Sequence, residues 1–340
     1  MRAGLGLARG LASVLAAVRE PLGAVVAGGS GAPAPVGRPL RVVSWNLQFC
    51  AGRGRRFFFD GGGQVHVGGD EVEDALAGAI GVLRGLSPDI VLLQEVDRGS
   101  DRTAGLDQHR RIADALGLGH EATAPYHRVG YLPHPPHRHL GRVDMHLSVL
   151  SRWPIRAAVR HPLPLLRESW LRQQFNLRRA ILELQVPLAD GGDLTLLDTH
   201  LSAFSYGDGT LARQVAMVGD RLDALEGQGG RWLLAGDFNA LPPGDAPGRL
   251  GEDAALYPEA ETPLRRLFER HRTPLRPEIR LDPAYRTWVP WGANRADRVL
   301  DYVFHGGGVE TAGFRVVPQG ARWSDHLPLV LDAHVRPRES

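Results

Sequence analysis

The sequence contains no lysine, so all 40 residues in its lysine-plus-arginine count are arginine. It has a single cysteine, Cys50, which excludes an intrachain disulfide and gives no sign of an oxidising compartment. No apolar stretch approaches the ~20 residues that a membrane-spanning helix needs. The formal net charge is only +2, so the composition does not demand a polyanionic partner. What is present is 43% hydrophobic and 23% charged residues, enough for a sizeable core.

The first 39 residues differ in composition from the rest of the chain. Their N-terminal part is rich in Ala, Leu, Val and Gly, as in a secretory signal, but Arg9, Arg19 and Glu20 interrupt the apolar run. A Gly/Pro/Ala linker follows. We therefore predict a flexible or poor signal-like leader over residues 1–39 and one domain over 40–340. The expected compartment is the cytoplasm, although this leader leaves export or membrane association open.

Beyond residue 40, apolar runs typical of strands alternate with helical stripes. Val72, Leu76, Ala79 and Leu83 recur at helical spacing and predict a helix over residues 70–86. The order strand, helix, strand at the start predicts a layered α/β domain. Strands are predicted at 40–47, 89–94, 147–150, 155–159, 179–186, 194–199, 232–235, 299–304, 313–317 and 327–333, further helices at 107–117, 210–225 and 262–271, and a Pro/His-rich loop at 124–141.

Polar residues recur where these apolar strands end or begin. In layered α/β proteins, strand ends are where a site is assembled from distant parts of the chain. Carboxylates, amides and histidines without a second cysteine form an oxygen-rich set, which suits Mg²⁺ or Mn²⁺ rather than zinc. The residues concerned are Asn46, Glu95, His200, Asp237, Asn239, Asp301, Asp325 and His326.

Six short motifs hold these residues in a recognisable order. They are Ser44-Trp45-Asn46, Leu93-Gln94-Glu95, Thr199-His200-Leu201, Gly236-Asp237-Phe238-Asn239, Leu300-Asp301-Tyr302 and Ser324-Asp325-His326. From about residue 40 to the C-terminus the chain thereby resembles the endonuclease/exonuclease/phosphatase superfamily, in its broad bacterial branch of metal-dependent hydrolases. The resemblance implies an α/β fold, a four-layer sandwich of two packed mixed β-sheets flanked by helices.

The resemblance also implies a metal site. Glu95 corresponds to the principal metal ligand, Asp325 to a second carboxylate that binds or orients the metal, and Asn46 to a residue that helps to hold metal and phosphate. The implied cofactor is Mg²⁺, and Mn²⁺ suits the same ligands.

Catalytic roles are implied for five residues. Asp237 resembles the residue that positions or deprotonates the attacking water, and Asn239 the donor to a phosphoryl oxygen. His326 resembles the histidine that contacts the scissile phosphate, with Asp301 as its orienting carboxylate. His200 matches a phosphate-contacting histidine. An Asp that directs water and His and Asn donors that stabilise the developing charge fit an in-line attack on phosphorus.

The six motifs do not include residues with a clear substrate-binding role. Arg178 and Arg179 offer guanidinium groups to a phosphate, but on a strand they would point to opposite sides. We predict that Arg178 contacts the substrate. Tyr126 and Tyr131 are the candidates for a phosphate-contacting tyrosine, of which we favour Tyr126.

Two loops carry further residues that could face a substrate. Arg53, Arg55 and Arg56 precede Phe57–Phe59, a pattern typical of a patch for nucleic acid or membrane, or of aromatics packed on the domain. The three histidines of the segment 134–139 lie among prolines, which favours an exposed substrate-side loop over a metal cluster.

The resulting hypothesis is a Mg²⁺-dependent phosphodiester hydrolase, with DNA or RNA ahead of other substrates. Abasic-site nucleases of the superfamily carry an acidic residue where this chain has Gln48, which weakens a specific DNA-repair role. The alternatives are a lipid phosphodiesterase that acts on a lipid headgroup, as sphingomyelinases do, or an inositol-type phosphatase. A non-catalytic binding module is a further alternative, and no protein partner is implied.

Overall fold

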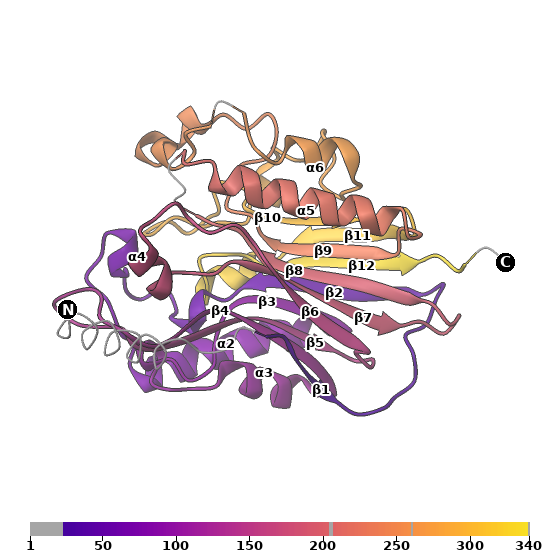
Figure 1. Cartoon of the computed structure of the whole chain (residues 1–340), viewed down its shortest axis with the longest axis horizontal. Helices are drawn as coiled ribbons and strands as arrows, with labels where there is room; N and C mark the ends of the chain where they lie inside the picture. The colour runs from indigo at the N-terminus through magenta and orange to yellow at the C-terminus, as the bar shows by residue number, and fades with distance from the viewer. Residues whose placement is uncertain (1–22, 204–206, 260, 339–340) are drawn as a thin grey trace, which may run out of the picture.

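Two β-sheets pack face to face in the computed structural model, which describes residues 23–203, 207–259 and 261–338 (Figure 1). The seven-stranded sheet has the order β1 (Val25–Gly28), β4 (His120–Leu132), β5 (Gly141–Ser151), β3 (Ile90–Asp97), β2 (Pro39–Asn46), β12 (Leu329–Val335) and β11 (Val309–Val316). The five-stranded sheet has the order β10 (Asp301–His305), β9 (Trp232–Asp237), β8 (Asp193–His200), β7 (Ala180–Pro187) and β6 (Ala157–Pro162).

Helices cover the outer face of each sheet. α2 (Gly69–Leu86) and α3 (Gln108–Leu116) lie against the larger sheet, while α5 (Thr210–Glu226) and the shorter α6 (Arg265–Arg270) lie over the smaller one (Figure 1). α4 (Trp170–Phe175) connects β6 to β7. The result is the four-layer α/β sandwich of two mixed sheets that the family resemblance implied.

Three apolar cores hold the layers together. Leu92 of β3 and Leu196 of β8 belong to the core between the sheets. Leu76 of α2 and Val218 of α5 belong to the two cores under the helices. Strands such as β3 and β8 therefore bury side chains on both faces of their sheets, toward the other sheet and toward the helices. This explains why these segments appear in the sequence as continuous apolar runs.

The register of the strands brings all of the strand-end motifs to one edge of the sandwich. β2 runs parallel to β3, and β8 runs parallel to β9, so their carboxyl ends point the same way. β10 is antiparallel to β9 with Asp301 opposite Asp237, so its amino end lies at this edge as well. β12 is antiparallel to β2, which brings the segment just before it to the same place. We refer to this edge as the site edge.

Two sequence predictions differ from the structure. The loop predicted at 124–141 is wrong over its first half, because β4 continues to Leu132 and pairs with β5 through Val129 and Val143. A register shift after Pro125 accommodates the proline and explains why the pattern did not resemble a regular strand.

Ordered structure also begins before residue 40, the predicted start of the domain. Val25–Gly28 pairs with β4 at the edge of the larger sheet, and Ala34 is buried in the core between the sheets. Residues 1–22 of the predicted leader lie outside the described residues. Within the described part of the chain, no helix combines the length and hydropathy needed to cross a bilayer.

Candidate active site

Asn46 connects two parts of the site edge. It ends β2 and is buried, and its Nδ2 donates to Oε1 of Glu95 at 3.2 Å and to Oδ2 of Asp237 at 3.0 Å. Its Oδ1 accepts a hydrogen bond from the backbone N–H of Gln48 at 2.9 Å. The amide is therefore held in one orientation between two carboxylates from different sheets.

Glu95 lies at a bulge in β3. The register with β5 shifts between Leu93 and Val96, and Glu95 has a φ of 55°, a left-handed conformation that is unfavourable for a residue with a Cβ. Its backbone N–H donates to the Tyr126 hydroxyl at 3.1 Å. Burial and the nearby Asp325 carboxylate raise the pKa of Glu95 above its ordinary value. Two neighbouring, half-buried carboxylates form a site that a cation would stabilise.

The Asp325 segment is fixed by contacts with β2 and with the loop before β10. The Ser324 hydroxyl donates to the carbonyl oxygen of Asn46 at 2.7 Å and accepts from the N–H of His326 at 3.1 Å. The Trp45 indole N–H donates to the carbonyl oxygen of His326 at 2.8 Å. The motif residues before β12 are thus held against the end of β2 by backbone and side-chain bonds together.

His326 is enclosed by two aspartates. Its Nδ1 lies 2.8 Å from Oδ2 of Asp301, and its Nε2 lies 3.6 Å from Oδ2 of Asp237. Burial opposes the imidazolium, but the carboxylates of Asp301 and Asp237 outweigh it and raise the pKa of His326 well above its usual value. The two aspartates therefore favour the protonated form of this histidine.

His200 has the opposite environment. Its Nε2 lies 3.3 Å from Oδ2 of Asp237, and its Nδ1 lies 3.1 Å from the Tyr126 hydroxyl. Burial and the positive charges of Arg179 and His326 lower the pKa of His200 well below its usual value. The site therefore favours the protonated form of one imidazole and the neutral form of the other, on either side of the same carboxylate.

Asp237 is a buried carboxylate at the end of β9. Burial raises its pKa to about 7, partly offset by the charge of His326 and by bonds from Asn239 and Asn46. Gly236 before it has a φ of 149°, and a Cβ there would lie 2.0 Å from the carbonyl oxygen of Thr199. Only glycine permits the close approach of β9 to β8 that brings Asp237 and His200 together.

Asn239 follows Asp237 in a left-handed conformation, with a φ of 50°. Its backbone N–H donates to Oδ1 of Asp237 at 2.9 Å, and its Nδ2 donates to the carbonyl oxygen of Leu201 at 3.0 Å. One of the two hydrogens on Nδ2 is used there, so the second would serve the predicted bond to a phosphoryl oxygen.

A sequence profile of the endonuclease/exonuclease/phosphatase family matches residues 43–326, most of the chain and all six motifs. The chain belongs to this family. Members of the endonuclease/exonuclease/phosphatase family are hydrolases of phosphoester bonds, and this chain is accordingly such a hydrolase. No curated protein matches the chain.

Solved structures of the family share the fold. An endonuclease/exonuclease/phosphatase protein of Beutenbergia cavernae is 24% identical with a TM-score of 0.62, over 88% of this chain and 72% of its own. D. rerio TDP2 complexed with a single-strand DNA product is 16% identical with a TM-score of 0.53, over 87% and 99% of the two chains. The Bacteroides thetaiotaomicron mannosyl-6-phosphatase is 15% identical with a TM-score of 0.54, over 86% and 99%.

The donor set of this family member fits a divalent cation. Glu95, Asp325 and Asn46 offer oxygens, and the raised pKa of Glu95 reflects a carboxylate that lacks a compensating charge. Asp237, Asp301 and His326 also place three ligand atoms within 4.8 Å of one another. In that second group His326 Nδ1 is already bonded to Asp301, and a protonated imidazole cannot bind a metal. We therefore favour the first group.

Of the two predicted substrate residues, Tyr126 lies at the centre of the site and Arg178 beside it. Tyr126 is buried and joins the Glu95 backbone to His200 through its hydroxyl. Arg178 is half-buried and donates to Oε1 of Gln174 on α4 at 3.3 Å. Its neighbour Arg179 is buried with its guanidinium 5.4 Å from the centre of the Tyr126 ring. The substrate role of Arg178 remains a prediction.

Two residues near the site were missed by the sequence interpretation. Burial and the charges of Asp325 and Glu95 raise the pKa of Asp60 to about 7, so a third carboxyl group faces the acidic pair. Thr287 accepts the backbone N–H groups of Leu300 and Asp301 at 3.0 and 3.1 Å and so supports the His326 partner. Neither residue lies at the end of a predicted strand, so the pattern of polar residues at strand ends does not point to either of them.

The aromatic loop and the histidine loop meet at the site edge. Phe57 is buried against Phe49, with ring centroids 5.0 Å apart, whereas Phe59 is 42% exposed. Phe58 contacts the ring of His134 at 5.5 Å. The aromatics therefore pack partly on the domain and partly face solvent.

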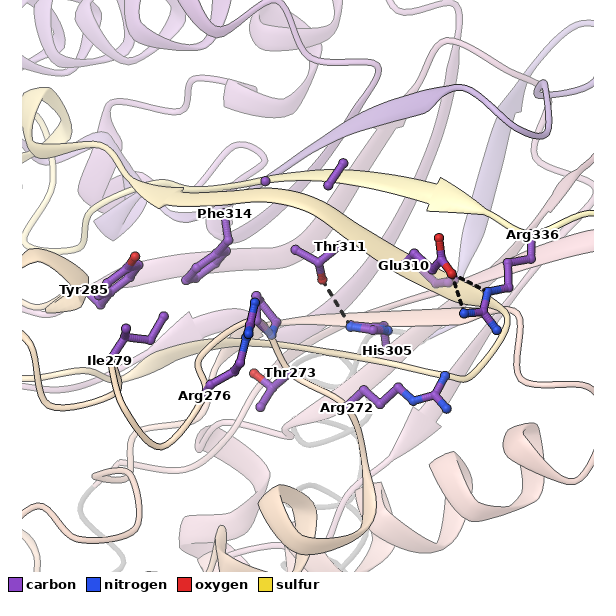
Figure 2. A pocket seen from close by; sticks show the side chains of 14 residues that line it. Arg272, Thr273, Arg276, Ile279, Tyr285, His305, Glu310, Thr311, Phe314 and Arg336 are labelled. Atoms are coloured by element: carbon purple, nitrogen blue, oxygen red, sulfur yellow. Dashed lines mark hydrogen bonds and ion pairs between the residues drawn. The ribbon is translucent and has the colours of Figure 1, made fainter.

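A separate hollow of about 570 Å³ lies away from this site (Figure 2). Arg272, Arg276 and His305 contribute to it, together with the stacked rings of Tyr285 and Phe314. His305 ends β10, four residues after Asp301, which corresponds to roughly 13 Å along the strand. The hollow contains none of the motif residues, so it is not the centre where phosphoester chemistry is expected.

Proposed function

We propose that this protein is a Mg²⁺-dependent phosphodiesterase that cleaves by in-line attack of water. The arrangement that supports the proposal best is the buried Asp301–His326–Asp237 series beside an acidic pair, Glu95 and Asp325. A cationic imidazole, a carboxylate with a pKa of about 7 and a cation site lie within one small volume. These are the three groups that hydrolysis of a phosphodiester needs.

Each side chain would perform a distinct step. Asp237 would orient the attacking water and accept its proton, because its pKa of about 7 makes it a competent base near neutral pH. His326 would donate a hydrogen bond to a non-bridging oxygen as negative charge accumulates there, and Asp301 would hold it in position. Asn239 would donate to a second oxygen. Magnesium held by Glu95, Asp325 and Asn46 would supply charge that stabilises the transition state.

The rim of the site supports a nucleic-acid strand as substrate. Within the described residues, the exposed aromatic side chains of Phe, Tyr and Trp are Phe59, Tyr131, Trp170 and Trp291, and all four lie on segments at the site edge. Each has an exposed arginine nearby in sequence, namely Arg56, Arg138, Arg172 and Arg295. Aromatic faces interleaved with arginines fit stacked bases and backbone phosphates. D. rerio TDP2, which shares the fold, is complexed with single-strand DNA.

One observation favours the lipid alternative. Trp170 and Leu171 are adjacent on α4 and are 61% and 51% exposed. Such a pair could insert at a bilayer surface and bring a lipid headgroup phosphodiester to the site.

The test is hydrolysis by purified protein with Mg²⁺ or Mn²⁺, across single-stranded DNA, RNA, sphingomyelin vesicles, inositol phosphates and bis-p-nitrophenyl phosphate. Asp237→Asn and His326→Ala are the inactive variants, and Asp114→Asn on the exposed face of α3 is the matched control. We expect single strands to be cleaved, EDTA to stop the reaction and only the control to retain activity. If sphingomyelin is the substrate that is turned over, the lipid alternative replaces the nucleic-acid one. No turnover on any substrate by folded, Mg²⁺-binding protein would contradict the proposed function and favour a binding module.

A further inference from the structure

Arg179 is a buried arginine whose charge has no fixed partner. The residue is only 6% exposed, yet among the described residues its Nε and Nη1 contact no hydrogen-bond acceptor. No carboxylate of the described chain lies within ion-pair distance of it. Its guanidinium carbon lies 5.4 Å from the centre of the Tyr126 ring. An unpaired buried cation is strongly unfavourable, so such a group is retained where an anion is to be bound.

The Arg179 charge is directed toward the active site. Its positive charge lowers the pKa of Glu95 and of His200, which lie on different sheets. The guanidinium therefore lies within electrostatic range of both sides of the site, although neither residue is close enough to be its partner.

The backbone before Arg179 is fixed by its neighbours. The N–H of Arg178 donates to the carbonyl oxygen of Tyr126 at 2.6 Å. Arg160 donates to the carbonyl oxygens of Pro125 and Arg178 at 2.9 and 2.6 Å. These bonds attach the segment before β7 to β4, so the backbone next to Arg179 is held in place.

We propose that Arg179, whose guanidinium lies over the Tyr126 ring, forms an anion subsite that holds a phosphoryl oxygen of the substrate next to the metal ligands. This proposal rests on the proposed function, because the anion it assigns is the phosphate that this site would cleave. Arg178 does not fit the role equally well, since its guanidinium contacts Gln174 on α4. The unpaired donors on Arg179 would gain an oxygen partner only when phosphate is bound.

Three measurements on the full chain test the subsite. Inorganic phosphate is the probe for binding by calorimetry in the presence of Mg²⁺, bis-p-nitrophenyl phosphate is the probe for turnover, and Tm without phosphate reports on folding. The variants are Arg179→Gln, Arg179→Lys and Arg179→Met, with Arg110→Gln on the exposed side of α3 as the control. A charge-assisted hydrogen bond predicts a loss of about 10- to 100-fold in phosphate affinity and in kcat/KM for Arg179→Gln. Arg179→Lys should retain part of both, because it keeps the charge.

The Tm separates an anion-binding role from a structural one. If the buried guanidinium has no partner in the free protein, Arg179→Met should leave Tm unchanged or raise it, whereas a structural arginine would lower it. A clear fall in Tm for Arg179→Met, or phosphate affinity of Arg179→Gln within about threefold of wild type, would overturn the proposal.

The result also distinguishes this proposal from the proposed function. Wild type that binds phosphate through Arg179 but turns over no phosphoester would keep the subsite and contradict the hydrolase mechanism. Wild type that turns over substrate, with Arg179→Gln equally active, would keep the mechanism and remove the subsite.

Discussion

The contact between Asp301 and His326 gives the sharpest prediction. Asp301→Asn replaces a charged acceptor by a neutral one of nearly the same shape, so a hydrogen bond to Nδ1 of His326 can persist while the negative charge is lost. The bond is 2.8 Å long and both residues are buried, so solvent does not screen the change. The substitution therefore isolates the electrostatic contribution of Asp301.

Its magnitude follows from the strength of a charged hydrogen bond. Such a bond contributes about 1.5–3 kcal/mol, and one pKa unit corresponds to ~1.4 kcal/mol. We expect the pKa of His326 to fall by about 1–2 units in Asp301→Asn. Asp237 on the other side of the ring is retained, so the pKa should remain above that of His200.

The sign of the pH dependence is fixed by the direction of the shift. A histidine whose pKa is raised in the folded state contributes stability that is fully present below its unfolded value of about 6.5 and is lost as pH rises through the folded value. Asp301→Asn should therefore lower the free energy of unfolding by about 1.5–3 kcal/mol near pH 6, and by less at pH values above the folded pKa of His326.

Two assays on metal-free protein in EDTA check this prediction. NMR titration of the His326 imidazole gives its pKa, and urea unfolding across pH gives the stability difference. Asp114→Asn is the control, because Asp114 forms an exposed ion pair with Arg110 one turn away on α3 and should change stability by no more than about 0.5 kcal/mol. A His326 pKa within about 0.3 unit of wild type in Asp301→Asn would refute the electrostatic role assigned to Asp301.

Three further substitutions test other contacts of the site. Burial and Asp325 raise the pKa of Glu95, so its ionised form destabilises the metal-free protein as pH rises. Glu95→Gln should therefore raise Tm near pH 8 in EDTA, and it should abolish the increase in Tm caused by Mg²⁺. Both changes in Tm can be measured by calorimetry. Gly236→Ala should destabilise by on the order of 3 kcal/mol or more in urea unfolding, because its Cβ would overlap the Thr199 carbonyl; wild-type stability would contradict the close approach of β8 and β9. Tyr126→Phe leaves the Glu95 N–H without its acceptor and should cost about 1–3 kcal/mol, again measured in urea.

The sequence was sufficient for the residues whose position is fixed by strand pairing. Asn46, Glu95, His200 and Asp237 each end an apolar run, and parallel pairing of β2 with β3 and of β8 with β9 brings those ends together. Periodicity and strand ends therefore predicted the layered fold and which of these side chains converge at the site edge, whereas their catalytic roles rest on the family resemblance and stay predictions.

Residues positioned by irregular segments could not be predicted in the same way. Arg178 and Arg179 are adjacent, and the side chain that lies against Tyr126 depends on how bonds to β4 and from Arg160 hold the Arg178 backbone. Asp60 comes from a glycine-rich loop with no periodicity, yet it lies close enough to Asp325 and Glu95 for their charges to raise its pKa. β1 was assigned to the leader because four exposed residues leave no alternation of buried and exposed positions in the sequence.

The two histidines of the site differ in charge for a reason that the fold imposes. His326 lies between Asp301 and Asp237, so two carboxylates favour its protonated form. His200 faces the same Asp237, but it also lies near Arg179 and His326, whose charges add to the effect of burial and favour its neutral form. Protonating both imidazoles would place two cations beside one buried carboxylate, with a third cation, Arg179, close enough to affect His200. Burial is the main reason that the neutral form of His200 is favoured, and the charge of Arg179 adds to it, which links the anion subsite to the protonation state of the catalytic centre.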